Sequence, residues 1–331
     1  MARNRVGTPK FYIDAMLLAR QWGMIETENT QGLFYLNPTK TKNMSFVECE
    51  NTLHTSITFK NRLYINSLSH IFYLGHSMFS SDIAIRLKAQ TGEDQEPYFS
   101  GDTYSDCILV DVNGWNKREF SAIENIDYHT LTAVFGRDVE ATPSFNLGEI
   151  SVGWSYAMPH SPDLELTQTF SNESLKTQTT VGGHSLSNVG WSQPPKWGDL
   201  PAWRLGASFV AYPMRRSWNL KFSYLSDTDI MPQYYNEIDS GSNNRGIFER
   251  TGTIADPTPD DGVDDSEDMF SIKDDFLSKV MPTINLGLPF IFQPNQEAQE
   301  FAICKVDNDS ISFNMVANNV YDISINLVEV W

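Results

Sequence analysis

The strongest constraint on the fold is the alternation of apolar and polar residues in short runs along most of the chain. One of the clearest runs lies near the end, where apolar residues occupy every second position: Tyr321, Ile323, Ile325 and Leu327. Successive side chains of a strand point to opposite faces of a sheet, so this period predicts a strand with one buried face. Comparable runs occur at 52–59, 82–89, 106–115, 149–156 and 218–224. The chain is therefore expected to be mainly β, built from antiparallel sandwich or barrel domains.

Only two segments predict helices. The first is expected near 12–22, where Gly23 stands in the position of a C-terminal cap. The second has apolar residues at spacings that place them on one helical face, and Pro282 is expected to end it. Its apolar residues are Met269, Ile272, Phe276 and Val280.

The composition of the sequence changes near residue 143, after which Pro- and Trp-rich segments and a long irregular insert appear, and this change suggests two regions. Residues 1–142 are expected to form an N-terminal mainly β region that contains the first helix. Residues 143–331 are expected to form a C-terminal β-domain with an acidic inserted loop at 239–268, which is longer and more polar than an ordinary connection. The last three predicted strands, 301–306, 310–315 and 320–331, are joined by short turns and predict an antiparallel meander.

Charge and hydropathy exclude several classes of partner. The chain has 331 residues and a formal net charge of −18, from 42 acidic against 24 basic residues. This excess disfavours a nucleic acid backbone or an anionic membrane surface as partner. No stretch approaches about 18 consecutive apolar residues, so no membrane span is expected. The first ten residues lack the apolar segment of a signal peptide, which predicts assembly in a cytoplasm.

The three cysteines are expected to be unpaired. Cys49, Cys107 and Cys304 are odd in number and far apart in the sequence. Such usage argues against a disulfide framework and fits a reducing compartment.

No residue pattern predicts a catalytic, cofactor-binding or metal site. The six histidines are dispersed, and none has a zinc-site spacing to another histidine or to a cysteine. Within the acidic loop, the EF-hand template fails because Pro257 and Pro259 occupy early ligand positions. An irregular calcium or magnesium site remains open beside the favoured interpretation, a solvated acidic loop. Its candidate ligands are Asp260, Asp261, Asp264 and Asp265.

Two further groups of residues have alternative interpretations. Trp191, Trp197 and Trp203 lie among prolines, where they could form a platform on which sugars stack. The favoured interpretation is that they anchor an irregular segment of the chain to a β-layer. Arg215 and Arg216 form a small basic spot in an acidic chain. We interpret this spot as an intersubunit salt bridge rather than as a phosphate site.

The last third of the sequence resembles a known class of proteins. The segment 215–229 with aromatic residues, a helix, and then "GLPFIFQPNQ", "FAICKV" and a terminal "EVW" are similar to the closing section of distal-tail and minor tail proteins of tailed bacteriophages. The residues that carry the resemblance are Leu288, Pro289, Phe290, Phe292, Pro294, 301–305 and 328–331. The resemblance covers about 115 residues at the C-terminus and a short N-terminal stretch, and its motifs are structural.

The resemblance implies a structural virion protein that forms a ring at the tail tip, as a distal-tail or baseplate-hub component. The expected partners are further copies of the chain and the neighbouring tube, hub and fibre proteins, in a virion tail assembled in the bacterial cytoplasm. No catalysis and no cofactor are implied. The candidate interface residues are Trp218, Phe290, Phe292 and Trp331.

Other functions remain open. Within a virion, the chain could be a neck or head decoration protein. In other classes, it could be a carbohydrate-binding module that contacts a host-surface glycan on a tail tip, or a tail-borne glycan hydrolase.

The C-terminal run also predicts something about packing. Leu327 ends one alternating face, and Val328 and Val330 fall on the other. A change of apolar side predicts a bulge, or a strand that meets a second surface. We expect Trp331 to pack against a neighbouring subunit there.

Overall fold

The structure is a computed structural model of the chain. It describes residues 7–21, 25–26, 33, 35–36, 42–45, 47–49, 52–61, 69–76, 84–90, 114–119, 130–138, 144–164, 167–171, 175–189, 215–231, 275–298, 300–308 and 310–330.

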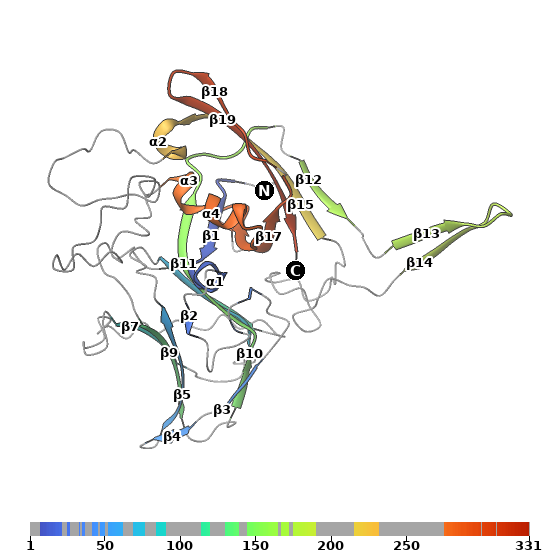
Figure 1. Ribbon diagram of the computed structural model, residues 1–331. Helices are drawn as coiled ribbons and strands as arrows, with labels where there is room; N and C mark the ends of the chain where they lie inside the picture. Colours follow the sequence, from blue (N-terminus) through green and yellow to red (C-terminus); the bar gives the residue numbers. More distant parts are fainter. Residues whose placement is uncertain are drawn as a thin grey trace, which may run out of the picture.

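The fold is mainly β with antiparallel sheets and four short helices in the described part, which confirms the expected fold class. The largest sheet has ten strands and is strongly curled, as Figure 1 shows. In sheet order, its strands are β12 (Thr167–Ser171), β15 (Arg215–Ser226), β19 (Val320–Glu329), β17 (Ala302–Val306), β16 (Phe290–Gln293), β1 (Lys10–Asp14), β11 (Glu149–Ala157), β6 (His70–His76) and β8 (Gly114–Glu119), with β18 (Phe313–Ala317) beside β19.

Three smaller sheets accompany the main sheet. A five-stranded sheet contains β2 (Ile25–Glu26), β5 (Thr52–Asn61), β9 (Thr130–Asp138) and β7 (Ala84–Gln90) in this order, with β4 (Val47–Cys49) beside β5. Two two-stranded antiparallel sheets are formed by β10 (Ser144–Leu147) with β3 (Lys42–Ser45) and by β13 (Leu175–Thr179) with β14 (Ser185–Val189). The helices are α1 (Ala15–Gln21), α2 (Asp227–Ile230), α3 (Phe276–Lys279) and α4 (Met281–Asn285).

The main sheet draws strands from both sides of the boundary expected at residue 143. Strands β1, β6 and β8 come from the first region, and the others come from the second. The apolar side chains of both regions therefore share one interior, and the two regions are not separate in their main sheet.

The first predicted helix is shorter than expected because its beginning is a strand. Residues 10–14 pair with β11 on one side and with β16 on the other. Phe11 and Ile13 lie on one face of this strand and Tyr12 and Asp14 on the other, and all four are buried, so the segment has no polar face that would mark it as a strand in the sequence. The helix α1 starts only after Asp14, whose Oδ1 accepts a hydrogen bond from the backbone N–H of Leu17 at 2.9 Å.

The second predicted helix is also corrected. Within the described part of this segment, the chain forms α3 and then α4, and Pro282 lies in the first turn of α4 instead of ending a helix. A proline is tolerated there because the first N–H groups of a helix have no intrahelical partner. Asp275 caps α3 by accepting a hydrogen bond from the N–H of Ser278 at 2.7 Å.

The larger hydrophobic cluster lies between the main sheet and the helices. Phe11 lies 6.0 Å from Phe276 of α3 and 5.4 Å from Phe292, measured between ring centroids. Trp154 donates from Nε1 to the carbonyl oxygen of Lys279 at 2.8 Å, which ties β11 to the end of α3. Each fully buried aromatic side chain of this kind contributes about 1.5–3 kcal/mol by leaving water.

A second, smaller cluster lies on the opposite face of β1. Tyr12, Phe72 and Phe301 meet there, and the rings of Phe72 and Phe301 are 5.7 Å apart although four strand pairings separate β6 from β17. Adjacent strands are about 4.8 Å apart, so this contact requires a strongly curled sheet.

The closing strands are antiparallel but do not form the expected meander. Strand β19 pairs with β15 along one side, and on the other side it pairs with β18 near its start and with β17 near its end. No described residue of β17 pairs with β18. The predicted strand at 310–315 is observed at 313–317.

Near the C-terminus the apolar side does change, without a bulge. Glu329 continues the inward face after Leu327, while Val330 packs against the second cluster and donates its N–H to the carbonyl oxygen of Ile303 at 2.9 Å. The second surface lies within the same chain. Trp331 lies outside the described residues.

A substitution at Gly153 tests the close approach of β1 and β11. A Cβ atom there would lie 1.9 Å from the carbonyl oxygen of Ile13 and 2.8 Å from the nitrogen of Ala15, both backbone atoms that cannot rotate away. We expect Gly153→Ala to lower the free energy of unfolding by about 2–4 kcal/mol in urea denaturation. Gly182→Ala is the control, because its Cβ would meet only His184 Cδ2 at 3.7 Å. Equal stability of the two variants would contradict the close approach.

Candidate functional site

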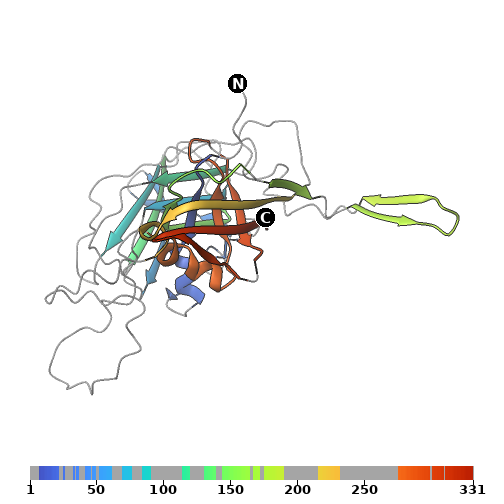
Figure 2. The same ribbon diagram turned by 90° about the horizontal axis from the view of Figure 1, so that it is seen from above.

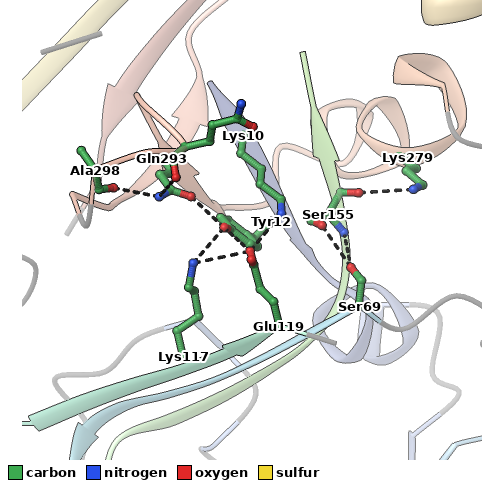
Figure 3. A network of polar contacts seen from close by, with 10 residues as sticks. Lys10, Tyr12, Ser69, Lys117, Glu119, Ser155, Lys279, Gln293 and Ala298 are labelled. Atoms are coloured by element: carbon green, nitrogen blue, oxygen red, sulfur yellow. Dashed lines mark hydrogen bonds and ion pairs between the residues drawn. The ribbon is translucent and has the colours of Figure 1, made fainter. Parts of the chain in front are cut away.

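A cluster of polar side chains surrounds the hydroxyl group of Tyr12 (Figure 3). The hydroxyl group is hydrogen bonded to Glu119 and lies 2.7 Å from Oε1 of Gln293. Lys117 donates to the same hydroxyl oxygen at 3.2 Å, and Lys10 forms an ion pair with Glu119 at 2.9 Å. Three strands of the main sheet, β1, β8 and β16, thus meet at one phenol group.

The amide group of Gln293 is held in one orientation. Its Nε2 donates to the carbonyl oxygen of Ala298 at 2.8 Å and to that of Gln296 at 3.3 Å. The oxygen Oε1 therefore faces Tyr12 as an acceptor. The turn after β16 is fixed to the cluster by these bonds.

The ionisation states of the cluster are set by burial and by mutual charge. Burial, followed by the hydrogen bond to Glu119, raises the pKa of Tyr12 well above its usual value. Burial alone would raise the pKa of Glu119, but Tyr12, Lys10 and Lys117 outweigh it and lower the pKa to about 2. Burial lowers the pKa of Lys117. Near pH 7 the hydrogen bond therefore joins a neutral phenol to an ionised carboxylate.

His70 is buried next to the cluster as a neutral side chain. Its ring stands edge-on to Tyr12 at 5.2 Å and to Phe72 at 5.5 Å. Burial lowers the pKa of His70 to about 3, and the positive charges of Lys10 and Lys117 act in the same direction while Glu119 opposes them. Among the described residues, neither ring nitrogen has a hydrogen-bond partner. His70 therefore packs as an aromatic residue.

A second buried polar cluster links β15 to the end of β19. Arg216 donates from Nε and Nη2 to the two carboxylate oxygens of Glu329 at 2.9 and 2.7 Å, a bidentate ion pair. It also donates from Nη1 to Glu300 at 2.8 Å and from Nη2 to the carbonyl oxygen of Phe301 at 2.9 Å. The salt bridge expected for Arg216 is thus observed, but it lies within the chain and not between subunits.

The candidate interface residues that the structure describes lie in the core. Trp218, Phe290 and Phe292 are at most 1 % exposed, and the rings of Trp218 and Phe292 are 5.3 Å apart. Their side chains stabilise their own chain, so an exposed assembly surface has to be sought elsewhere. Trp331 lies outside the described residues, and its role as an interface residue stays a prediction.

The hairpin of β13 and β14 is exposed at each of its described side chains, 177–186. Figure 2 shows it extending away from the body of the chain. The two strands pair in register from Leu175 with Val189 to Thr179 with Ser185. Val181 at its tip and Leu186 in β14 are large apolar side chains exposed to solvent. A hairpin with no cover on either face is a candidate site for contact with another molecule.

Exposed apolar side chains also gather where β18 and β15 flank the start of β19. Met315 and Leu225 both pair with Tyr321, one from each side. Bulges lie beside this row, and Val316 and Tyr224 in these bulges are 51 % and 81 % exposed. Tyr224 has a φ of 63°, a conformation that a bulky residue rarely adopts.

The sequence contains a signal that indicates the β13–β14 hairpin. Gly182 and Gly183 stand between two runs rich in Thr, Ser and Val, and a Gly-Gly pair between such runs is typical of a hairpin turn. Gly183 adopts a φ of 79° in this turn. The polar clusters of Tyr12 and Arg216 had no comparable signal, because their members are far apart in the sequence.

Several sequence-based expectations fall on residues outside the described ranges. These are the tryptophans at 191, 197 and 203, the acidic loop at 239–268 with its candidate metal ligands, and Cys107. Cys304 is described as a free, buried thiol, and burial, followed by the charge of Glu329, raises its pKa.

No group of three or more His, Cys, Asp or Glu side chains among the described residues is arranged to hold a metal ion. No helix among the same residues is both long and apolar enough to cross a membrane.

Comparison with known proteins gave no relative: no family model matches the chain, and neither a curated protein nor a solved structure is significantly similar to it.

Replacing His70 tests its neutral state. In the unfolded chain, a histidine takes up a proton near pH 6.5, whereas the folded chain resists until about pH 3. The unfolded state binds more protons between these values, so wild-type stability decreases as the pH falls through this window. We expect His70→Phe to remove about 2–3 kcal/mol of the decrease between pH 6.5 and 4.5 in urea denaturation.

The comparison has to be made as a difference between the two proteins, because Asp14 titrates in the opposite sense. Burial raises the pKa of Asp14 to about 7, and the hydrogen bond from Leu17 only partly opposes this. Its contribution to stability therefore decreases as the pH rises from about 4 to 7. The same pH dependence in wild type and His70→Phe would show that folded His70 binds a proton after all.

A double-mutant cycle tests the Arg216–Glu329 pair. Arg216→Met and Glu329→Leu should each cost about 3–5 kcal/mol of unfolding free energy, because each leaves a buried charge without its partner. The double variant should cost clearly less than the sum. Lys221→Met, on an exposed position of β15, should change stability by less than about 0.5 kcal/mol. Strict additivity of the two single changes would contradict the coupling.

Proposed function

We propose that this chain is a structural virion protein of a tailed bacteriophage, a ring-forming distal-tail or baseplate-hub component at the tail tip. Its partners under this proposal are further copies of itself and the adjoining tube, hub and fibre proteins. The observation that supports the assembly role is the β13–β14 hairpin, which extends from the body (Figure 1) and whose described side chains, 177–186, are exposed.

The sequence resemblance supports the choice of protein class. Phe290 and Phe292, two of its residues, pack against Phe11 at 5.6 and 5.4 Å. The segments 290–293 and 302–306 form adjacent strands in the middle of the main sheet. The shared pattern thus coincides with positions that determine the core, as a resemblance in fold requires.

The polar clusters support a structural role as well. Glu119 forms an ion pair with Lys10 at 2.9 Å, and Arg216 forms one with Glu329 at 2.7 Å, both within the chain. In both clusters, charged side chains are hydrogen bonded to partners within the chain.

Localisation in particles tests the proposal. An epitope tag can be inserted beside Leu164, which is fully exposed and lies between β11 and β12, outside the hairpin. We expect antibody labels at the tail tip in electron micrographs of particles that carry the tagged chain. Labels at the neck or on the head would favour a neck or decoration protein instead, and particles that lack the chain altogether would overturn the proposal.

A further inference from the structure

The β13–β14 hairpin lacks the cover that stabilises a sheet. Its described side chains from Thr177 to Leu186 are all exposed. An isolated two-stranded hairpin is only marginally stable in water and gains stability when a third strand or a packed face is added. The hairpin would therefore gain stability from a further strand or a packed face.

The turn of the hairpin is nevertheless well formed by its own bonds. Thr180 accepts at its carbonyl oxygen from the N–H of Gly183 at 2.9 Å and donates its own N–H to the carbonyl oxygen of His184 at 2.8 Å. The hydroxyl of Thr180 accepts from the N–H of His184 at 3.1 Å. A turn fixed in this way presents the strands in one shape and lowers the entropy lost on binding.

Strand β18 is an edge of the main sheet. Among the described strands, β18 pairs with β19 alone. Its sequence, "FNMVA", contains no charged residue and no proline, two common protections of an edge strand, and a bulge at Val316 interrupts its pairing with β19. Met315 and Val316 expose apolar side chains along it, and Tyr224 adds an exposed aromatic ring beside the row that Met315 shares with Tyr321.

Neither the hairpin nor this edge contains an acidic residue. At a net charge of −18, two copies repel each other wherever acidic surfaces meet. No aspartate or glutamate occurs from residue 174 to residue 198, which includes the hairpin, and no charged residue of any kind occurs from 310 to 321, which includes β18. These two segments can approach each other without that repulsion.

We propose that the β13–β14 hairpin of one copy docks on the β18 edge of a second copy. The hairpin points away from its own body in both views, so it does not reach β18 of its own chain (Figures 1 and 2). Strands of five residues on each side match in length, and pairing would cover an open edge and an uncovered hairpin at once. This contact rests on the proposed assembly role and specifies how copies join.

The contact is head-to-tail, because the two surfaces differ. Each copy carries one hairpin and one β18 edge, so every added copy offers a new free edge and a new free hairpin. Such a heterologous contact generates a closed ring when the rotation between copies closes, and an open chain otherwise.

Two substitutions, each on one of the two surfaces, test the contact. Leu186→Glu places a charge on the hairpin and Val316→Glu places one on β18, both at exposed positions. We expect each variant to self-associate at least about tenfold more weakly than wild type in sedimentation velocity over a concentration series. Leu186→Thr and Val316→Thr remove the apolar side chain but keep strand propensity and add no charge. Each should weaken self-association less than the glutamate substitution at the same position.

Mixing the two glutamate variants isolates the head-to-tail geometry. The Leu186→Glu chain retains an intact edge, and the Val316→Glu chain retains an intact hairpin. An equimolar mixture should therefore form dimers that neither variant forms alone, and growth should stop at the dimer because the remaining surfaces are both altered.

Leu164→Glu is the matched control, since Leu164 is fully exposed but belongs to neither surface. It should associate like wild type. Wild-type chains that stay monomeric at every concentration, glutamate variants that associate normally, or a mixture that gives no dimer would each overturn the contact. Localisation at the tail tip is measured separately, so the virion role can stand if this contact fails.

Discussion

Strand β1 holds the main sheet together. It pairs with β11 on one side and with β16 on the other, and so joins strands from the first half of the chain to the C-terminal strands. Residues 11–14 are buried on both faces of this strand: Phe11 and Ile13 enter the larger hydrophobic cluster, and Tyr12 enters the smaller one. A strand in this position cannot move without separating two halves of a sheet, and the neighbouring contacts are built around it.

The close approach at Gly153 and the polar cluster at Tyr12 both follow from this arrangement. Because β1 turns directly into α1 after Asp14, the backbone at 13–15 passes over β11, and only glycine leaves room there. The curl of the sheet brings Glu119 of β8 to the hydroxyl of Tyr12 although two strands lie between β1 and β8. Buried polar groups of this kind cost free energy unless they are paired, so they fix one curvature of the sheet in preference to others.

Much of the strand content could be predicted from the sequence, because alternation is a local property. The β15 and β19 runs have one polar face and one apolar face, and both are observed as long strands. Strand β6 was missed, since "HIFYLGH" is buried on both faces and does not alternate. The same reason made Lys10–Asp14 look like the start of a helix.

The pairing of strands and the polar clusters could not be predicted, because they depend on contacts between distant residues. Arg216 and Glu329 are 113 residues apart, and Tyr12 and Gln293 are 281 apart. Aromatic residues near a sequence motif suggested an interface. Large apolar side chains are equally common in a protein core, so their presence fits either position. Trp218, Phe290 and Phe292 show this ambiguity: composition alone does not distinguish a core from an interface.

Inside the chain, charge is neutralised at short range, and this shapes what is left for contacts between molecules. Glu119, Glu329 and Arg216 form ion pairs in which their charges are held close to a partner of opposite sign. The excess of acidic residues elsewhere gives copies a repulsion that acts over about 10 Å at 0.1 M salt. Attraction at shorter range then has to come from backbone hydrogen bonds and apolar contacts. Strand edges and hairpins without acidic residues supply both. A strand edge offers N–H and C=O groups along its length, and its apolar side chains add contact area without adding charge.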